Sequence, residues 1–339
     1  MNAVRVLVVD DSAFARKVLR ESLSASPHIE VVGIARDGID ALEKIAELHP
    51  DVITLDLVMP NLDGLGVLAA LTPEQRSRVV VVSMADGETD IGVSALGWGI
   101  FDLVHKPTAL AVASLHDIAE ELINKVLLAS AQPPRVWPSA PDAPVMPSVL
   151  ASDKVVLIGT STGGPQALTR LLKALPANFP APIAIVLHIP TGYTGPLAER
   201  LNTECAIDVL EARDGLVARP GLAILAQAGM HLRLVNEQGE LVARIHAEPS
   251  NAVHRPAVDV LFESAALSCG NRALGVVLTG MGDDGLLGAR AIHAAGGQIL
   301  TESEASCVVY GMPRCVIEAG LSTAAVSLEE MAIAITSRL

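Results

Sequence analysis

The chain has 339 residues, a formal net charge of −14 at pH 7, and a composition in which 50% of the residues are hydrophobic. This length is sufficient for two domains, each with its own core. The acidic charge disfavours a nucleic-acid partner, because such binding needs a basic surface that displaces counterions from phosphates. No apolar run reaches the ~18 residues that span a membrane, so we expect no membrane insertion.

The N-terminus and the cysteines indicate the compartment. The first apolar run starts at Val4 without the basic and small-residue flanks of a secretory signal. The four cysteines have neither C-x-x-C spacing nor histidine partners at zinc-ligand spacing. These cysteines are Cys205, Cys269, Cys307 and Cys315. We expect buried thiols in a cytoplasmic protein.

Short apolar runs alternate with helical patterns over the first 125 residues. Five of these runs are predicted to be strands: Val4–Val9, Val31–Ala35, Val52–Leu55, Val79–Val82 and Leu103–Val104. Strands that are apolar throughout and separated by helices are typical of a parallel sheet covered on both faces. The sequence therefore predicts an α/β domain with a doubly wound, flavodoxin-like sheet.

Polar residues end four of the five predicted strands. Asp10 and Asp11 end the first strand, Asp56 the third, Ser83 the fourth and Lys106 the fifth. These ends meet at one edge of a parallel sheet, where three carboxylates repel one another unless a cation lies among them. Carboxylate oxygens suit Mg²⁺, and a carboxylate beside Mg²⁺ and a lysine is equipped to accept a phosphoryl group.

Residues 1–125 resemble the receiver domain of response regulators over their whole length. The match includes the motif Asp56-Leu57-Val58-Met59-Pro60-Asn61-Leu62-Asp63-Gly64. The resemblance implies that a histidine kinase phosphorylates Asp56, that Asp10 and Asp11 are the acidic pair, and that Ser83 and Lys106 are the switch residues. One departure is Leu103, which stands where many receivers have an aromatic residue. This puts their aromatic rotamer switch in question, but not phosphorylation.

Prolines interrupt the chain after the first domain. Between them lie alanine and serine, a composition that predicts an extended linker. We place the receiver domain at residues 1–125, the linker at 126–152 and a second domain at 153–339, with the last receiver helix running from Leu115 to Val126. The prolines are Pro133, Pro134, Pro138, Pro141, Pro144 and Pro147.

The second domain begins with a glycine-rich turn. The apolar run Val155–Ile158 leads into Gly159-Thr160-Ser161-Thr162-Gly163-Gly164. The pattern G-x-S-x-G holds a serine on a sharp strand-to-helix turn with its hydroxyl exposed. Taken alone, the segment is equally compatible with a nucleophile, an ordinary turn or a phosphate-binding loop.

Two later apolar runs also end in polar residues. Ile183–Leu187 is followed by His188, and Leu274–Leu278 by a loop that contains Asp283 and Asp284. His188 alone would suit a core histidine with a backbone partner. At one edge of a parallel sheet, however, Ser161, His188 and one of the two aspartates form a triad of nucleophile, general base and orienting carboxylate.

Backbone geometry and chain order support acyl transfer at this edge. The N–H groups near Thr162 and Met281 are candidates for binding an oxyanion. Lipase-like α/β-hydrolases have the chain order Ser, Asp, His, whereas the order here is Ser, His, Asp. A dinucleotide site needs an acidic residue at the end of its second strand, and that strand ends in His188.

Residues 153–335 resemble the catalytic domain of the chemotaxis protein-glutamate methylesterases, the CheB family. The matching segments are Ile158–Pro165, His188–Thr194, Glu199–Asn202, His254–Pro256, Val258–Phe262, Leu278–Gly285 and Tyr310–Pro313. The family's catalytic residues fall on Ser161, His188 and Asp284. Asp284 is preferred to Asp283 because the family motif places its acid directly before the glycine. Ile189 stands where the family often has methionine.

This second resemblance implies a function. The expected reactions are hydrolysis of glutamyl methyl esters on chemoreceptors, with release of methanol, and deamidation of receptor glutamines. Phosphorylation of Asp56 is expected to relieve obstruction of the catalytic cleft by the receiver. We expect Mg²⁺ at the receiver site, no metal or cofactor at the esterase site, and a monomer.

A non-catalytic output domain is the alternative from a different class. A phosphorylation-dependent DNA-binding regulator is disfavoured by the acidic charge and by the lack of a helix-turn-helix pattern after the linker. Neither observation argues against a phosphorylation-dependent scaffold. Reaction of Ser161 with an active-serine reagent distinguishes the enzyme from the scaffold.

Overall fold

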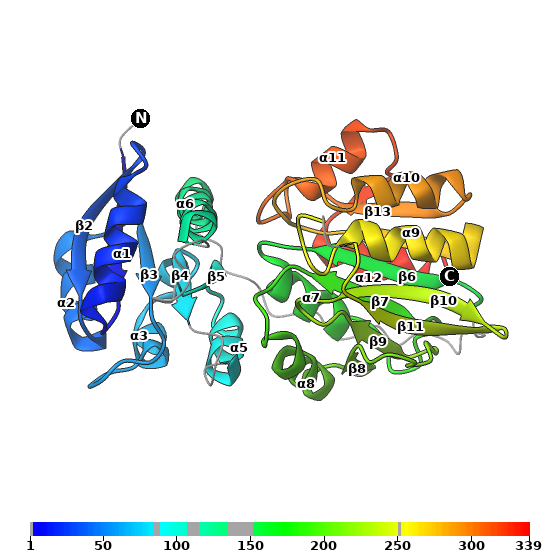
Figure 1. The fold of residues 1–339 in the computed structure, drawn as a ribbon, viewed down its shortest axis with the longest axis horizontal. Coiled ribbons are helices and arrows are strands. Elements are labelled where there is room, and N and C mark those ends of the chain that lie inside the picture. The colour runs from blue at the N-terminus through cyan, green and yellow to red at the C-terminus, as the bar shows by residue number, and fades with distance from the viewer. Residues whose placement is uncertain (1–2, 84–88, 107–114, 134–151, 250–251) are drawn as a thin grey trace. The chain divides into compact units, whose positions relative to one another are not determined.

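The computed structural model describes residues 3–83, 89–106, 115–133, 152–249 and 252–339 (Figure 1). The chain divides into an N-terminal unit, Met1–Pro138, and a C-terminal unit, Ser139–Leu339. The prolines of the predicted linker from Pro134 onward lie outside the described residues. Among the described helices, none has the length and apolar character needed to cross a bilayer.

A five-stranded parallel sheet forms the centre of the N-terminal unit. Its strands are β1 (Val4–Val9), β2 (Ile29–Ala35), β3 (Val52–Leu55), β4 (Val79–Ser83) and β5 (Asp102–His105). They lie in the order β2-β1-β3-β4-β5, and every pair is parallel. All five predicted strands are present, and the predicted doubly wound fold is confirmed.

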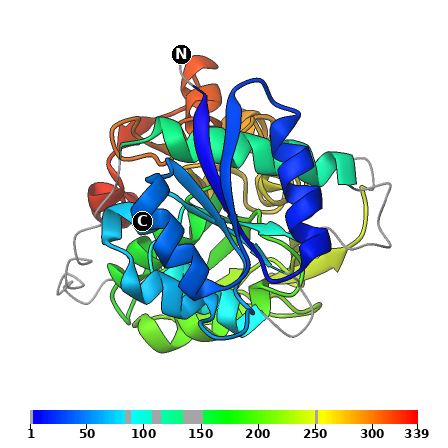
Figure 2. The same cartoon turned by 90° about the vertical axis from the view of Figure 1, so that its left-hand side faces the viewer.

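Helices cover both faces of this sheet. They are α1 (Ala13–Ser24), α2 (Gly38–Leu48), α3 (Gly64–Ala70), α4 (Pro73–Arg76), α5 (Thr89–Gly97) and α6 (Leu115–Ala131). Helix α1 packs with α6, and α3 packs with both α2 and α5. In Figure 2, where this unit faces the viewer, α2 and α3 lie across the strands from α1. This cover explains why β3 and β4 are buried along their whole length.

The end of α6 corrects the predicted start of the linker. We expected the linker from residue 126, but the helix continues to Ala131. Leu122, Val126 and Ala129 are all buried. Their spacing continues one apolar helical face past the predicted boundary, so the packing of that face keeps residues 126–131 helical.

The C-terminal unit contains a larger, seven-stranded parallel sheet. Its strands are β6 (Val155–Thr160), β7 (Ile183–Leu187), β8 (Asp208–Glu211), β9 (Leu222–Leu225), β12 (Ala273–Val277), β13 (Gln298–Glu302) and β14 (Ala324–Val326). Their order is β14-β13-β12-β6-β7-β9-β8. Along the chain, the strands β7, β8 and β9 all lie on one side of β6, and β12, β13 and β14 lie on the other. A doubly wound sheet has its topological switch point at such a place, and ligand sites form there.

Two helical layers enclose this sheet. The helices are α7 (Gly164–Lys173), α8 (Thr194–Glu204), α9 (Val258–Cys269), α10 (Leu286–Ala294), α11 (Met312–Glu318) and α12 (Leu328–Thr336). Helix α9 packs with α10, and α7 packs with α8 and α12 (Figure 1). The hairpin of β10 (His231–Glu237) and β11 (Glu240–His246) packs against α9. Phe262 on α9 is fully buried in the resulting core.

Candidate functional site

Three adjacent strands, β7, β6 and β12, bring the predicted triad to one edge of the C-terminal sheet. Ser161 follows β6, and its backbone N–H donates to the carbonyl of Thr279 after β12, at 3.1 Å. His188 follows β7, and its N–H donates to the carbonyl of Thr160 at 3.1 Å. The three strand ends therefore remain hydrogen-bonded to one another past the last residues of the sheet.

Ser161 occupies the first position of a tight turn. The Gly164 N–H donates to the Ser161 carbonyl at 2.7 Å, and Gly163 has φ = 77° and ψ = −2°, the third-position conformation of a type II turn. A side chain is strained at such a positive φ, which accounts for glycine here. The Thr279 hydroxyl donates to the Thr162 carbonyl at 2.9 Å and so fixes this turn to the loop after β12.

His188 and Asp284 form a direct pair. The distance from His188 Nε2 to Asp284 Oδ2 is 2.8 Å, and both side chains are about nine-tenths buried. His188 Nδ1 is also buried and has no hydrogen-bond partner in the described part of the chain. When Nε2 carries the proton that Asp284 accepts, Nδ1 presents a lone pair. Asp283 is exposed, so the histidine contacts the acid that directly precedes the glycine.

Asp284 also caps helix α9. Its Oδ2 accepts from the Val258 N–H at 2.7 Å, and its Oδ1 accepts from the Asp259 N–H at 2.9 Å. These N–H groups belong to the first turn of α9, where the cap residue Ala257 makes no side-chain bond. Burial by itself raises the pKa of Asp284, but the hydrogen bonds from His188 and from α9 outweigh it, and the pKa lies below its usual value.

Two backbone N–H groups beside Ser161 are available to a ligand. The N–H groups of Thr162 and Met281 have no acceptor among the described residues. Thr162 lies two residues before α7, whose cap residue is Gly163, and unpaired N–H groups and the helix dipole at a helix start favour negative charge. A side chain at Gly280 would lie 2.9 Å from Ser161 Cβ, so the loop that carries Met281 is in contact with the serine.

Two histidines with no predicted role lie at this site. The His254 ring stacks on His188, with centroids 4.1 Å apart and an interplanar angle of 23°. His231 Nδ1 accepts from the Ala257 N–H at 3.2 Å, and its Nε2 donates to the Pro249 carbonyl at 3.1 Å. His231 thus holds both ends of the segment that carries His254. The only sequence signal was the block His254–Pro256, which matched the family but suggested no function.

The predicted phosphorylation site assembles in the N-terminal unit. Lys106 Nζ lies 2.8 Å from Asp56 Oδ2 and 2.9 Å from Asp10 Oδ2. Its backbone N–H donates to the carbonyl of Ser83, a buried residue that ends β4. Burial lowers the pKa of Lys106, but the two carboxylates outweigh it and hold the pKa above its usual value. All the predicted residues of this site except Asp11 are buried.

The acidic cluster fits a magnesium ion. One carboxylate oxygen each from Asp10, Asp11 and Asp56 lies within 4.8 Å of the other two. Burial raises the pKa of Asp10, an electrostatic cost that a bound cation would reduce. Mg²⁺ binds through a few carboxylates and keeps several waters. Asp11 is exposed, which leaves one side of the cluster open for them.

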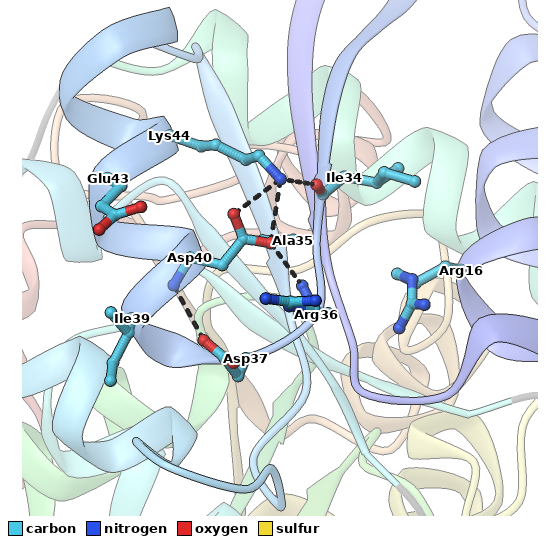
Figure 3. A pocket seen from close by; sticks show the side chains of 9 residues that line it. All are labelled: Arg16, Ile34, Ala35, Arg36, Asp37, Ile39, Asp40, Glu43 and Lys44. Carbon is cyan, nitrogen blue, oxygen red and sulfur yellow. Dashed lines mark hydrogen bonds and ion pairs between the residues drawn. The ribbon is translucent and has the colours of Figure 1, made fainter.

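A cavity of about 530 Å³ lies elsewhere on the N-terminal unit, beside α2 (Figure 3). Several of its charged groups already have ion-pair or hydrogen-bond partners. Asp40 Oδ1 lies 2.7 Å from Lys44 Nζ, and Asp37 accepts from the Asp40 N–H and from the Asn61 side chain, both at 2.9 Å. Asp37, Asp40 and Lys44 are therefore already engaged with neighbouring groups.

Both halves of the chain are similar to known proteins. The CheB methylesterase family model matches residues 156–335, and the response regulator receiver domain model matches residues 6–118. The protein-glutamate methylesterase/protein-glutamine glutaminase 5 of Myxococcus xanthus is 58% identical over 337 residues, which cover 98% of this chain and 97% of the relative. A similarly named protein of Symbiobacterium thermophilum is 44% identical over 353 residues, with coverage of 98% and 96%.

A solved structure agrees with these sequence relatives. The crystal structure of the Thermotoga maritima CheB methylesterase catalytic domain is 37% identical, covers 56% of this chain and 100% of that chain, and gives a TM-score of 0.54. The similarity thus extends to the fold of the C-terminal unit, with the receiver match in front of it. The chain belongs to the CheB methylesterase family and carries a response regulator receiver domain.

Proposed function

We propose that Ser161, His188 and Asp284 hydrolyse glutamyl methyl esters on chemoreceptors. The observation that carries this proposal is the orientation of His188. Its Nε2 is bonded to Asp284 while its buried Nδ1 has no partner in the described chain. Nδ1 is therefore the nitrogen available to take a proton from Ser161, which lies at the end of the neighbouring strand β6.

The reaction proceeds through an acyl-enzyme. Ser161 Oγ attacks the ester carbonyl as His188 accepts its proton, and Asp284 stabilises the imidazolium that forms. His188 then returns the proton to the departing methoxy oxygen, and methanol leaves. Water deprotonated by His188 attacks the glutamyl ester of Ser161 and releases glutamate. With a glutamine substrate the same steps release ammonia, which accounts for the deamidation implied by the names of the relatives.

The N–H groups of Thr162 and Met281 are proposed to bind the oxyanion. Both lack acceptors in the described residues and lie on the two segments that contact Ser161. Oxyanion donors act by stabilising charge that develops only in the tetrahedral state. No metal or cofactor is assigned to this site.

Phosphorylation of Asp56 is proposed to regulate the esterase. Asp56 would accept a phosphoryl group from a histidine kinase, with Lys106 and Ser83 as the switch residues. Asp10, Asp11 and Asp56 would hold Mg²⁺, which supplies positive charge to the transferring phosphoryl oxygens. We place the receiver in residues 1–131, because α6 continues to Ala131, the linker in residues 132–152 and the catalytic domain in residues 153–339. The receptor and kinase partners and a monomeric state belong to the same proposal.

The cysteines are consistent with the cytoplasm, where a kinase and the receptor helices are accessible. Within the described residues, Cys205, Cys269, Cys307 and Cys315 form no disulfide. Burial raises the pKa of Cys205 to about 11, so this thiol stays protonated and unreactive at neutral pH. Cysteines outside disulfides are typical of a reducing compartment.

Methanol release from methylated receptor membranes tests the proposed function. With a small-molecule phosphodonor present, we expect Ser161→Ala to lower the rate by about 10³-fold or more. Ser337→Ala is the matched control, because Ser337 is exposed on the same unit. An active-serine reagent should label the wild type and not Ser161→Ala. Equal rates for wild type and Ser161→Ala, with no labelling, would instead support a scaffold.

A further inference from the structure

Helices α9 and α10 begin side by side. Asp284, in the loop before α10, caps α9, and Asp259, in the first turn of α9, caps α10. Asp284, just before α10, accepts from the N–H groups of Val258 and Asp259 in α9, at 2.7 and 2.9 Å. Asp259 Oδ1 in turn accepts from the N–H groups of Gly285 and Gly288, at 2.9 and 2.8 Å. This reciprocal pair satisfies four N–H groups that helix starts normally leave unpaired.

Close packing fixes the distance between the two helix starts. A Cβ atom at Gly288 would lie 2.4 Å from Phe262 Cβ and 3.1 Å from Asp259 Cα. Real Cβ atoms do not come as close as 2.4 Å to another atom, so α10 can contact α9 at this point only with glycine at position 288. The Asp259 carboxylate is thereby held within reach of both of its donors.

The two carboxylates also differ electrostatically. Burial and the negative charge of Asp284 raise the pKa of Asp259 to about 6, against the hydrogen bonds from Gly285 and Gly288. The pKa of Asp284 is lowered. When one proton is shared between two neighbouring carboxylates, it resides on the one with the higher pKa. The proton therefore goes to Asp259, and Asp284 stays ionised beside His188.

We propose that Asp259 is a positioning residue for the esterase reaction, because it holds Asp284 in place by two routes. Its backbone N–H donates to the Asp284 carboxylate, and its side chain holds Gly285, the next residue in the chain. Loss of the side-chain route lets the Asp284 carboxylate move away from His188 Nε2, so that the imidazole loses its fixed tautomer. This inference rests on the proposed function of the triad.

Two substitutions in the full chain distinguish the hydrogen bonds of the Asp259 side chain from its negative charge. Asp259→Ala removes both side-chain bonds, and we expect kcat for methanol release to fall by about 10–100-fold with KM within about twofold. Asp259→Asn keeps an Oδ1 that accepts from Gly285 and Gly288, so we expect kcat to recover to within about threefold of the wild type.

The pH profile gives a readout that a purely structural residue would not change. The charged groups that face Asp259 are Asp284, from the loop before α10, and Glu263, on its own helix. Helix α10 presents the Gly285 and Gly288 N–H groups to it. Asp259→Asn removes a negative charge near the Asp284–His188 pair, which disfavours protonated His188. We therefore expect the acid limb of its kcat/KM profile to move to lower pH.

Glu240→Gln is the matched control, because Glu240 is an exposed carboxylate on β11 of the same unit. We expect it to leave kcat, KM and the pH profile unchanged. The proposal is overturned if Asp259→Ala retains wild-type kcat, or if Asp259→Asn loses as much activity as Asp259→Ala with an unshifted profile. If Asp259→Ala does not fold, Asp259→Asn and its profile decide alone.

A spectroscopic measurement keeps this inference separable from the proposed function. The His188 Nε2–H proton, bonded to Asp284, should give a downfield NMR signal that is retained in Asp259→Asn and lost in Asp259→Ala. If the wild type releases no Ser161-dependent methanol, the proposed function fails, while this signal still tests Asp259. An unchanged signal in folded Asp259→Ala refutes the positioning role even if the esterase is confirmed.

Discussion

The two units of this chain gather carboxylates at the same place in similar folds and stabilise them by different means. In the N-terminal unit, Asp10 and Asp56 lie at the carboxyl edge of the sheet, and Lys106 supplies the compensating charge. In the C-terminal unit, Asp284 lies at the corresponding edge, where two backbone N–H groups of α9 and the His188 ring compensate it. A lysine side chain compensates the carboxylates at one edge, and backbone dipoles compensate the carboxylate at the other.

This difference matches the roles proposed for the two sites. A lysine and a bound metal ion can rearrange when a phosphoryl group adds charge, so the receiver edge is suited to switching. Backbone N–H groups at the start of a packed helix do not move without unfolding the helix. The Asp284 edge is therefore preorganised, which is what acyl transfer requires. Four experiments test this contrast.

The largest effect is expected at the fixed edge. Asp284→Asn should lower the rate of methanol release by about 10³–10⁴-fold, because the amide favours the wrong histidine tautomer. Asp283→Asn is the control, since Asp283 is exposed and only the adjacent Asp284 contacts His188. The control should stay within about twofold of the wild type. If Asp283→Asn loses activity and Asp284→Asn keeps it, the catalytic acid is Asp283 and not Asp284.

The second experiment concerns the switching edge. Asp56→Asn should keep the activity that the wild type shows without a phosphodonor, and it should lose all stimulation by one. The physical reason is that the amide cannot accept the phosphoryl group that Lys106 and the metal ion would stabilise. Methanol release with and without the phosphodonor measures this ratio. Stimulation that persists in Asp56→Asn removes Asp56 from its proposed role.

The third experiment tests the metal cluster. Asp11→Asn should slow phosphorylation of the full chain by roughly tenfold and raise the Mg²⁺ concentration that gives half the maximal rate, because one of three ligands loses its charge. Chelation of Mg²⁺ should stop phosphorylation without changing unstimulated methanol release. Glu43→Gln, which removes an exposed carboxylate on α2, serves as the control. Equal Mg²⁺ dependence in Asp11→Asn and Glu43→Gln would contradict the assignment.

The smallest effect is a pH-dependent loss of stability near the fixed edge. Burial lowers the pKa of His231 from 6.5. As the pH falls below 6.5, the unfolded chain therefore binds more protons than the folded protein, and the stability of the folded protein decreases. Between pH 7.5 and 5.5, the wild type should lose a few degrees more in Tm than His231→Asn does. His246→Asn is the control, because His246 is exposed and lies opposite His231 in the hairpin. Parallel behaviour of all three proteins would exclude His231 as the cause.

Much of the fold was predictable because its central strands are unambiguous. Runs such as Val79–Val82 and Ile183–Leu187 are apolar throughout, Val52–Leu55 is apolar except for Thr54, and all three are too short for helices; the structure has strands at all three. In the described part of the C-terminal unit, β6, β7 and β12 were predicted, whereas β9, β13, the β10–β11 hairpin and the edge strands β8 and β14 were missed. The two edge strands have only 4 and 3 residues and are partly exposed, so their sequences carry little of the continuous apolar signal.

The sequence by itself determined the kinds of chemistry available, because residue type and position after a strand follow directly from the chain. Ser161, His188 and Asp284, like Asp10, Asp56 and Lys106, were identifiable as residues at strand ends. Only the tertiary structure decided which atoms meet. The bond from His188 Nε2 to Asp284, the caps exchanged between α9 and α10, and the His254 ring over His188 all join distant segments. Such contacts depend on helix packing and close backbone approach, which local patterns do not encode.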